Sequence, residues 1–312
     1  MSVPAGRSRA PAYRPDIDGL RALAVISVIL FHNGIPGFDG GYVGVDVFFV
    51  ISGYLITQLL EESRDESAPR RLATFYVRRM RRILPALLAT CLVTAIVAIA
   101  LFSPDQLVNV GKFLAATPVM LSNVATWTRG DYFAPGVRQL PLSHLWSISV
   151  EEQFYLIYPL LLIAITRYRL PYRRLTLVVF ASLSLALCVW ASHRAPEANY
   201  VFAPTRAWEL LLGGMLTIGG VPRIGNRIAA EGLAVAGLLG IAIAVHFYTS
   251  AIRYPGTAAM LPCMASAALL ATGSGPRPAL VNRMLSWPPL VFIGLISYSL
   301  YLWHQPLLAF VN

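Results

Sequence analysis

The chain has 312 residues, of which 56% are hydrophobic and only 13% are charged. Because soluble domains carry about 25% charged residues, this composition excludes an ordinary soluble enzyme. Apolar runs of about twenty residues, the length that crosses a bilayer, recur from one end to the other. The sequence therefore predicts an all-α, polytopic transmembrane helical bundle whose surroundings are the lipid bilayer.

About nine membrane spans are predicted. They cover residues 17–35, 43–61, 83–102, 143–165, 175–193, 204–221, 228–248, 256–273 and 289–310. With the N-terminus inside, 18 of the 25 Lys and Arg residues fall on the inner side and five on the outer side. This positive-inside bias orients the chain, so the formal charge of +10 indicates topology and not nucleic-acid binding. No cleavable signal peptide precedes the first span.

Residues 105–127 are moderately apolar but contain Lys112, two asparagines and a proline. Counting this segment as a span would place the basic stretch RYRLPYRR outside, against the charge rule. We therefore expect an outer interfacial or re-entrant helix here.

No metal centre is predicted. The cysteines at 91, 188 and 263 lie in or beside apolar spans without CxxC spacing, which favours small buried side chains. The five histidines have neither the i, i+4 spacing nor the nearby acid of a zinc motif.

The first span carries two ionisable residues, Arg21 and His32, on one helical face about 16 Å apart. Hydrocarbon penalises such groups, so this face should point into the bundle or a wet cavity. Asp18 can form an i, i+3 ion pair with Arg21. Asp46 opens the next span near the depth of His32, and a histidine beside a carboxylate is a competent general base. A histidine that merely reaches the outer headgroups explains this stretch equally well.

Six arginines lie between residues 70 and 82 with no acid among them. Arg78 with Arg81, or Arg79 with Arg82, are neighbours on a helix surface and suit a bidentate grip on phosphates. Taken alone, the cluster is better interpreted as a topology anchor that touches anionic lipid.

Glu151 and Glu152 lie about 12 Å into a predicted span, and burying two carboxylates requires partners or protonation. Adjacent helical residues diverge by ~100°, so we expect one glutamate in the histidine cavity and the other in a structural ion pair. Arg206 or Arg21 is the expected ion-pair partner. Glu152 is slightly favoured for the cavity.

The stretch PTRAWELLLG places Arg206 three residues before Glu209. An internal ion pair is the preferred interpretation of this spacing, and a wall of the active cavity is the alternative.

Taken together, several stretches resemble the integral-membrane acyltransferase-3 family, the O-acetylases of bacterial surface polysaccharides. In chain order they are YRPDIDGLRALAVISVILFH, GGYVGVDVFFVISGYLIT, FYVRRMRRILPALL, LSHLWSISVEEQFYLIYPLLL, PTRAWELLLG and ISYSLYLWHQPLL. The sequence looks most like the branch with a periplasmic SGNH-type domain after the membrane part. Its abrupt end suggests at least one further helix in the parent protein.

The resemblance implies transfer of an acetyl group from cytoplasmic acetyl-CoA to a glycan hydroxyl at the bacterial inner membrane, without a metal. The resemblance implies His32 as a catalytic residue, and the buried carboxylates described above add Glu152, Glu151 and Asp46 to the catalytic set. It implies a donor-binding set of Arg21, Arg78, Arg79, Arg81 and Arg82. In this scheme His32 deprotonates the acceptor or is itself acylated, and a glutamate orients it.

A proton-coupled transporter that uses the buried glutamates and His32 as a proton relay is the competing hypothesis. The lack of detectable internal repeats speaks against it. Thermal stabilisation by CoA would distinguish the two, because only the acyltransferase should bind it.

Overall fold

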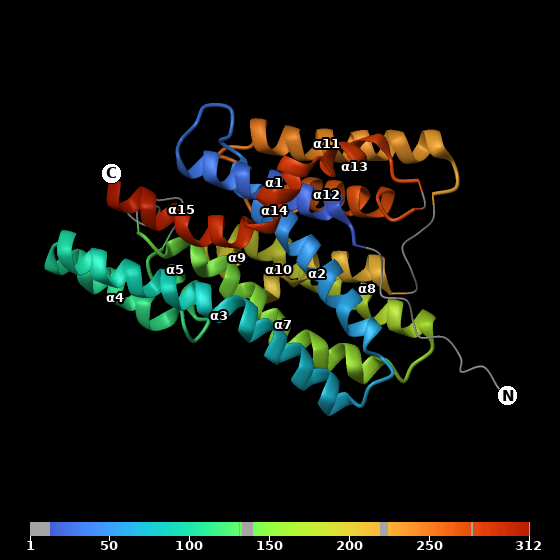
Figure 1. Ribbon diagram of the computed structural model, residues 1–312, viewed down its shortest axis with the longest axis horizontal. Coiled ribbons are helices and arrows are strands. Elements are labelled where there is room, and N and C mark those ends of the chain that lie inside the picture. The colour runs from blue at the N-terminus through green and yellow to red at the C-terminus, as the bar shows by residue number, and fades with distance from the viewer. Residues whose placement is uncertain (1–12, 131, 133–139, 219–223, 276, 312) are drawn as a thin grey trace.

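The computed structural model describes residues 13–130, 132, 140–218, 224–275 and 277–311. These residues form helices and no β-strand, which confirms the predicted helical membrane bundle (Figure 1). Within these described residues, five helices are long and apolar enough to cross a membrane: Gly41–Glu62, Ala68–Leu101, Ser143–Ile165, Leu170–Arg194 and Arg227–Phe247.

The structure describes the following α-helices, in chain order. They are α1 (Pro15–His32), α2 (Gly44–Glu62), α3 (Ala68–Leu101), α4 (Pro104–Ala116), α5 (Ser122–Trp127), α7 (Trp146–Ile165), α8 (Leu170–Arg194), α9 (Pro196–Val201), α10 (Ala203–Thr217), α11 (Arg227–Phe247), α12 (Met260–Thr272), α13 (Leu280–Leu285), α14 (Pro288–Leu295) and α15 (Ser297–Val311). Short 3-10 helices lie at Gly41–Val43, Ser143–Leu145 and Thr257–Ala259.

The last predicted span, 289–310, is not a single helix. It consists of α14 and α15, which meet at Ile296. α14 packs against α1, while α15 also reaches α3. The break lets the two halves pack against different neighbours, which one straight helix would not do.

The segment expected to be an interfacial or re-entrant helix forms two short helices, α4 and α5, joined by a turn in which Met120 has a φ of 57°. Neither is long enough to cross a hydrocarbon core of ~30 Å. α5 packs on α7, where the backbone N–H of Ser122 donates to the Ser149 hydroxyl at 3.1 Å. The segment therefore contributes to the wall of the bundle without spanning it.

The arginine cluster lies within α3 and not in a loop. The connection after α2 covers only residues 63–67, so most of the expected inner segment 62–82 is helical. With 34 residues α3 is about 51 Å long, well beyond the thickness of a hydrocarbon core. Figure 1 shows it as the long diagonal helix along the lower edge of the bundle.

Glycines allow the central helices to touch. A Cβ on Gly53 of α2 would lie 1.7 Å from the Leu210 carbonyl oxygen, and one on Gly213 of α10 would lie 1.9 Å from that of Val50. Close backbone approach at small residues is the usual packing mode of membrane helices. α10 in turn packs on α8, so a dense block forms behind α2.

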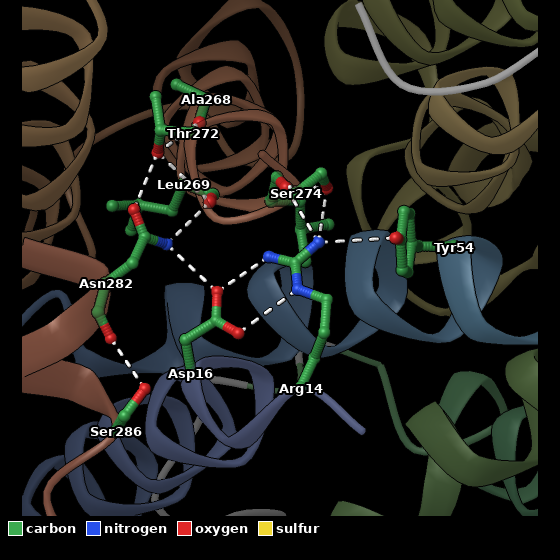
Figure 2. A network of polar contacts seen from close by, with 10 residues as sticks. Arg14, Asp16, Tyr54, Ala268, Leu269, Thr272, Ser274, Asn282 and Ser286 are labelled. Carbon is green, nitrogen blue, oxygen red and sulfur yellow. Dashed lines mark hydrogen bonds and ion pairs between the residues drawn. The ribbon is translucent and has the colours of Figure 1, made fainter. Parts of the chain in front are cut away.

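A polar network ties the first turn of α1 to α12 and α13 (Figure 2). Asp16 accepts from Arg14 at 2.6 Å and from Asn282 at 3.0 Å. Arg14 also donates to the Tyr54 hydroxyl at 3.2 Å, and Asn282 accepts from Thr272 at 2.8 Å. The network fixes the end of the bundle where α1 and α3 begin, called the arginine end below.

Candidate active site

A cavity of about 540 Å³ lies between α1, α2, α3, α7 and α15. This volume is typical of sites that bind small molecules and cofactors. Its charged lining comes mostly from the predicted site residues and their neighbours: Arg14, Asp18, Arg21, Glu62, Arg78, Arg79, Arg82, Glu151 and Glu152. Arg81, Asp46 and His32 are not among its lining residues.

Arg79 is the centre of the charged wall. Its guanidinium lies 3.1 Å from the Glu152 carboxylate and 3.6 Å from that of Glu151, and stacks over the Tyr155 ring at 4.0 Å. Glu151 also accepts from the Ser52 hydroxyl at 2.5 Å and from the Tyr155 hydroxyl. The arginine and its two carboxylates thus form one cluster, the Arg79 cluster, which joins α3 to α7.

The expectation that the two glutamates serve different targets is wrong. Both line the cavity and both contact Arg79, whereas the predicted partners Arg206 and Arg21 pair elsewhere. Side chains that diverge by ~100° on α7 still converge here because a guanidinium is broad and reaches them from another helix.

The remaining arginines of the cluster on α3 separate into two groups. Arg78 and Arg82 line the cavity and have no hydrogen-bond or ion-pair partner among the residues that the structure describes, whereas Arg81 points to the surface. Only the 79–82 pair therefore has both members on the cavity. The pattern RRMRR left this register open, because three-residue spacing fits either pair.

On the α1 side the cavity wall carries one negative and one positive side chain, Asp18 and Arg21. Arg21 forms the predicted ion pair with Asp18 at 3.2 Å. Tyr13, at the start of the described chain, donates its hydroxyl to Asp18 at 2.7 Å, and this hydrogen bond raises the pKa of the phenol. Asp18 thus neutralises Arg21 and keeps its side chain on the cavity wall.

His32, at the last turn of α1, contacts another histidine and a tyrosine. Its Nδ1 lies 3.0 Å from Nε2 of His304, and its Nε2 lies 3.1 Å from the Tyr132 hydroxyl. No role was predicted for His304 or Tyr132 from the sequence. A histidine in the apolar stretch LYLWHQP was the available signal, because intramembrane ionisable groups are usually functional.

The histidine pair adjoins the cavity beside Tyr301. Tyr301 lines the cavity, and its hydroxyl lies 2.6 Å from that of Ser147. Its backbone carbonyl lies 2.7 Å from Nδ1 of His304, one turn further along α15. The site therefore has a charged arginine end and a histidine end, linked through Tyr301.

The sequence predicted Asp46 as the carboxylate beside His32. In the structure Asp46 belongs instead to a second ion cluster. Its carboxylate lies 3.0 Å from Arg206, which also lies 2.9 Å from Glu209. The predicted Arg206–Glu209 pair is confirmed. Asp46 and Glu209 also lie near Cys263, with candidate metal-ligand atoms within 4.8 Å, but the Arg206 cation already occupies this cluster.

Comparison with known proteins identifies the family to which this chain belongs. The family model described as an acyltransferase domain matches residues 14–312. The chain belongs to the acyltransferase-3 family. Membership fits the geometry, since acyl transfer requires a base near a cavity that can hold an acyl donor.

Two known O-acetyltransferases are similar in sequence to nearly the whole chain. O-acetyltransferase OatA of Staphylococcus aureus is 34% identical over 319 residues, covering 97% of this chain and 52% of that protein. Peptidoglycan O-acetyltransferase OatA of Listeria monocytogenes is 33% identical over 311 residues, covering 95% and 50%. The chain thus spans about half the length of the curated relatives it matches. No solved structure matches it.

Proposed function

We propose that the protein is a membrane O-acetyltransferase that moves an acetyl group from acetyl-CoA to a hydroxyl of a cell-envelope glycan. The observation that carries this proposal is a single cavity with unpaired arginines at one end and a histidine pair beside the other. The named relatives support the acetyl group and the glycan, because one is called a peptidoglycan O-acetyltransferase. The membrane is the bacterial inner membrane, with the arginine end on the cytoplasmic side.

The donor phosphates would bind Arg78 and Arg82. Both line the cavity, and no described residue pairs with either. Guanidinium groups bind phosphate strongly in bidentate geometry, so these two have binding capacity to spare. Arg79 is different, because its charge already faces two carboxylates. It would shape the wall along which the pantetheine arm extends.

The acetyl group would reach the histidine end, where His32 acts as general base. His32 Nε2 would take the proton of the acceptor hydroxyl as its oxygen attacks the thioester carbonyl. The C–S bond breaks when the tetrahedral intermediate collapses, and the same proton passes to the CoA thiolate. The products are the acetylated hydroxyl and free CoA, with His32 restored.

A thermal-shift titration with CoA and acetyl-CoA tests donor binding on the purified protein in detergent. We expect both to raise the melting temperature, since a ligand that binds only the folded state stabilises it. The double variant Arg78→Ala with Arg82→Ala should lose most of this shift, and Arg81→Ala, an exposed arginine of the same helix, should keep it.

Acetylation of cell-surface glycan tests the transfer step. His32→Ala should insert and melt normally and give no acetylation. Wild-type acetylation by that variant would refute the base role. A protein that CoA does not stabilise, but that moves protons across vesicles, would support the transporter instead.

A further inference from the structure

His304 has a defined hydrogen-bond geometry at both ring nitrogens. Nδ1 lies 2.7 Å from the backbone carbonyl oxygen of Tyr301, and Nε2 lies 3.0 Å from Nδ1 of His32. The residue is buried in α15, and its ring centroid lies 5.0 Å from that of His32. These contacts determine where the protons of the pair lie.

The backbone carbonyl of Tyr301 can only accept a hydrogen bond. His304 Nδ1 must therefore carry a proton and donate it. In a neutral ring the other nitrogen, Nε2, is then bare and accepts. His32 Nδ1 must consequently carry the proton that His304 Nε2 accepts.

The protonation of Nδ1 decides whether Nε2 of His32 carries a proton. With a proton on Nδ1, the neutral His32 ring has a bare Nε2, which accepts from the Tyr132 hydroxyl at 3.1 Å. A bare nitrogen that faces a hydroxyl is the arrangement a general base needs. In the opposite tautomer this nitrogen would carry a proton and could not remove another.

We propose that His304 is the positioning residue of the site, and that it holds His32 in the Nδ1-protonated tautomer, in which Nε2 carries no proton and can act as base. A carboxylate commonly performs this task for a catalytic histidine. Here the carboxylate expected to do so, Asp46, is paired with Arg206. The role in transfer rests on the proposed function, whereas the tautomer assignment does not.

His32, His304 and His144 lie close together at this point. Among the described histidines, only His304 forms a hydrogen bond with His32. His144 is fully buried, and its ring centroid lies 4.9 Å from that of His304. Neither of its ring nitrogens makes a hydrogen bond within the described structure. His144 is therefore a matched control for the loss of a buried imidazole next to His304.

Nitrogen NMR of protein labelled in its five histidines tests the tautomer directly. We expect His32 in the wild type to carry its proton on Nδ1, with a bare Nε2. His304→Leu, which removes the acceptor, should release His32 into a mixture of tautomers. His304→Gln should restore the wild-type signal, because its amide oxygen replaces Nε2 as an acceptor. His144→Leu should leave the His32 signal unchanged.

The transfer rate is the second measurement, made with melting temperatures on the same four proteins. His304→Leu should lose about 10²-fold or more in kcat with KM for the donor unchanged, as expected for a lost base. His304→Gln should recover most of that rate, and His144→Leu should remain within a few-fold of the wild type.

Two results would overturn the proposal: a His32 tautomer that is unchanged in His304→Leu, or a His304→Gln variant as inactive as His304→Leu at equal melting temperature. If the tautomer responds as expected but the wild type transfers no acetyl group, the proposed function fails and the positioning of His32 stands.

Discussion

The Arg79 cluster and the cluster around Arg206 carry the same set of charges, but they differ in their exposure to solvent. In the Arg79 cluster, Arg79 with Glu151 and Glu152, the side chains are 14%, 21% and 17% exposed. In the Arg206 cluster, Arg206 with Asp46 and Glu209, no side chain exceeds 1%. Each consists of one arginine and two carboxylates, but only the first lines the cavity.

The surroundings of the two clusters explain the difference. Arg79 lies on α3 at the cavity wall, where water and a ligand can solvate excess charge. Arg206 is surrounded by aromatic rings, with Phe49, Trp146 and Tyr200 centroids 5.4 to 5.7 Å from its guanidinium carbon. Full burial makes the Arg206 cluster a structural element, because its two carboxylates depend on the Arg206 cation. The Arg79 cluster, in contrast, lies on the wall of the cavity.

The largest expected effect comes from removing the deeper arginine. Arg206→Ala leaves two fully buried carboxylates without a cation, and breaking a buried pair in this way costs about 3–5 kcal/mol. We expect poor expression and a much lower melting temperature in detergent. Arg79→Ala should cost less, because water in the cavity can reach Glu151 and Glu152. Equal losses of melting temperature in both variants would refute the distinction.

Neutralising one carboxylate of the Arg79 cluster should have a smaller effect, and it should lower acetyl transfer while leaving stability nearly unchanged. Glu151→Gln leaves Glu152 to hold Arg79, so folding should change little. It disturbs the hydrogen bonds from Ser52 and Tyr155 on the cavity wall, and acetyl transfer should fall about tenfold, or 1.4 kcal/mol.

Asp46→Asn is the matched change in the Arg206 cluster. Glu209 still balances Arg206 in this variant, so both transfer and melting temperature should stay close to those of the wild type. An inactive but stable Asp46→Asn protein would return Asp46 to the catalytic set predicted from the sequence.

The smallest effect is a difference in thiol reactivity. Ser52→Cys places a thiol on the cavity wall beside Glu151, whereas the native Cys263 lies beside the Arg206 cluster and is fully buried. A small maleimide should label Ser52→Cys at a measurable rate, and Cys263 only after unfolding. Labelling is followed by mass spectrometry of digested protein. CoA should slow the reaction at position 52, and rapid labelling of Cys263 would show that water reaches the deeper cluster.

Local spacing was a reliable guide where both partners belong to one helix. The Asp18–Arg21 and Arg206–Glu209 pairs form as their i, i+3 spacing predicts, because helix geometry alone brings such residues together. Partners on different helices were predicted less well. Asp46 with Arg206, and both glutamates with Arg79, depend on how α2, α3, α7 and α10 pack.

The sequence by itself determined the membrane environment, the helical class, the family and most charged residues of the cavity wall. These follow from composition, from hydrophobic length and from motifs that are local in the chain. Only the tertiary structure decided that Arg79 holds both glutamates, that Asp46 belongs to a buried cluster, and that His304 meets His32. The last pair is separated by 272 residues, and the hydrogen bond between them depends on how α15 packs against α1.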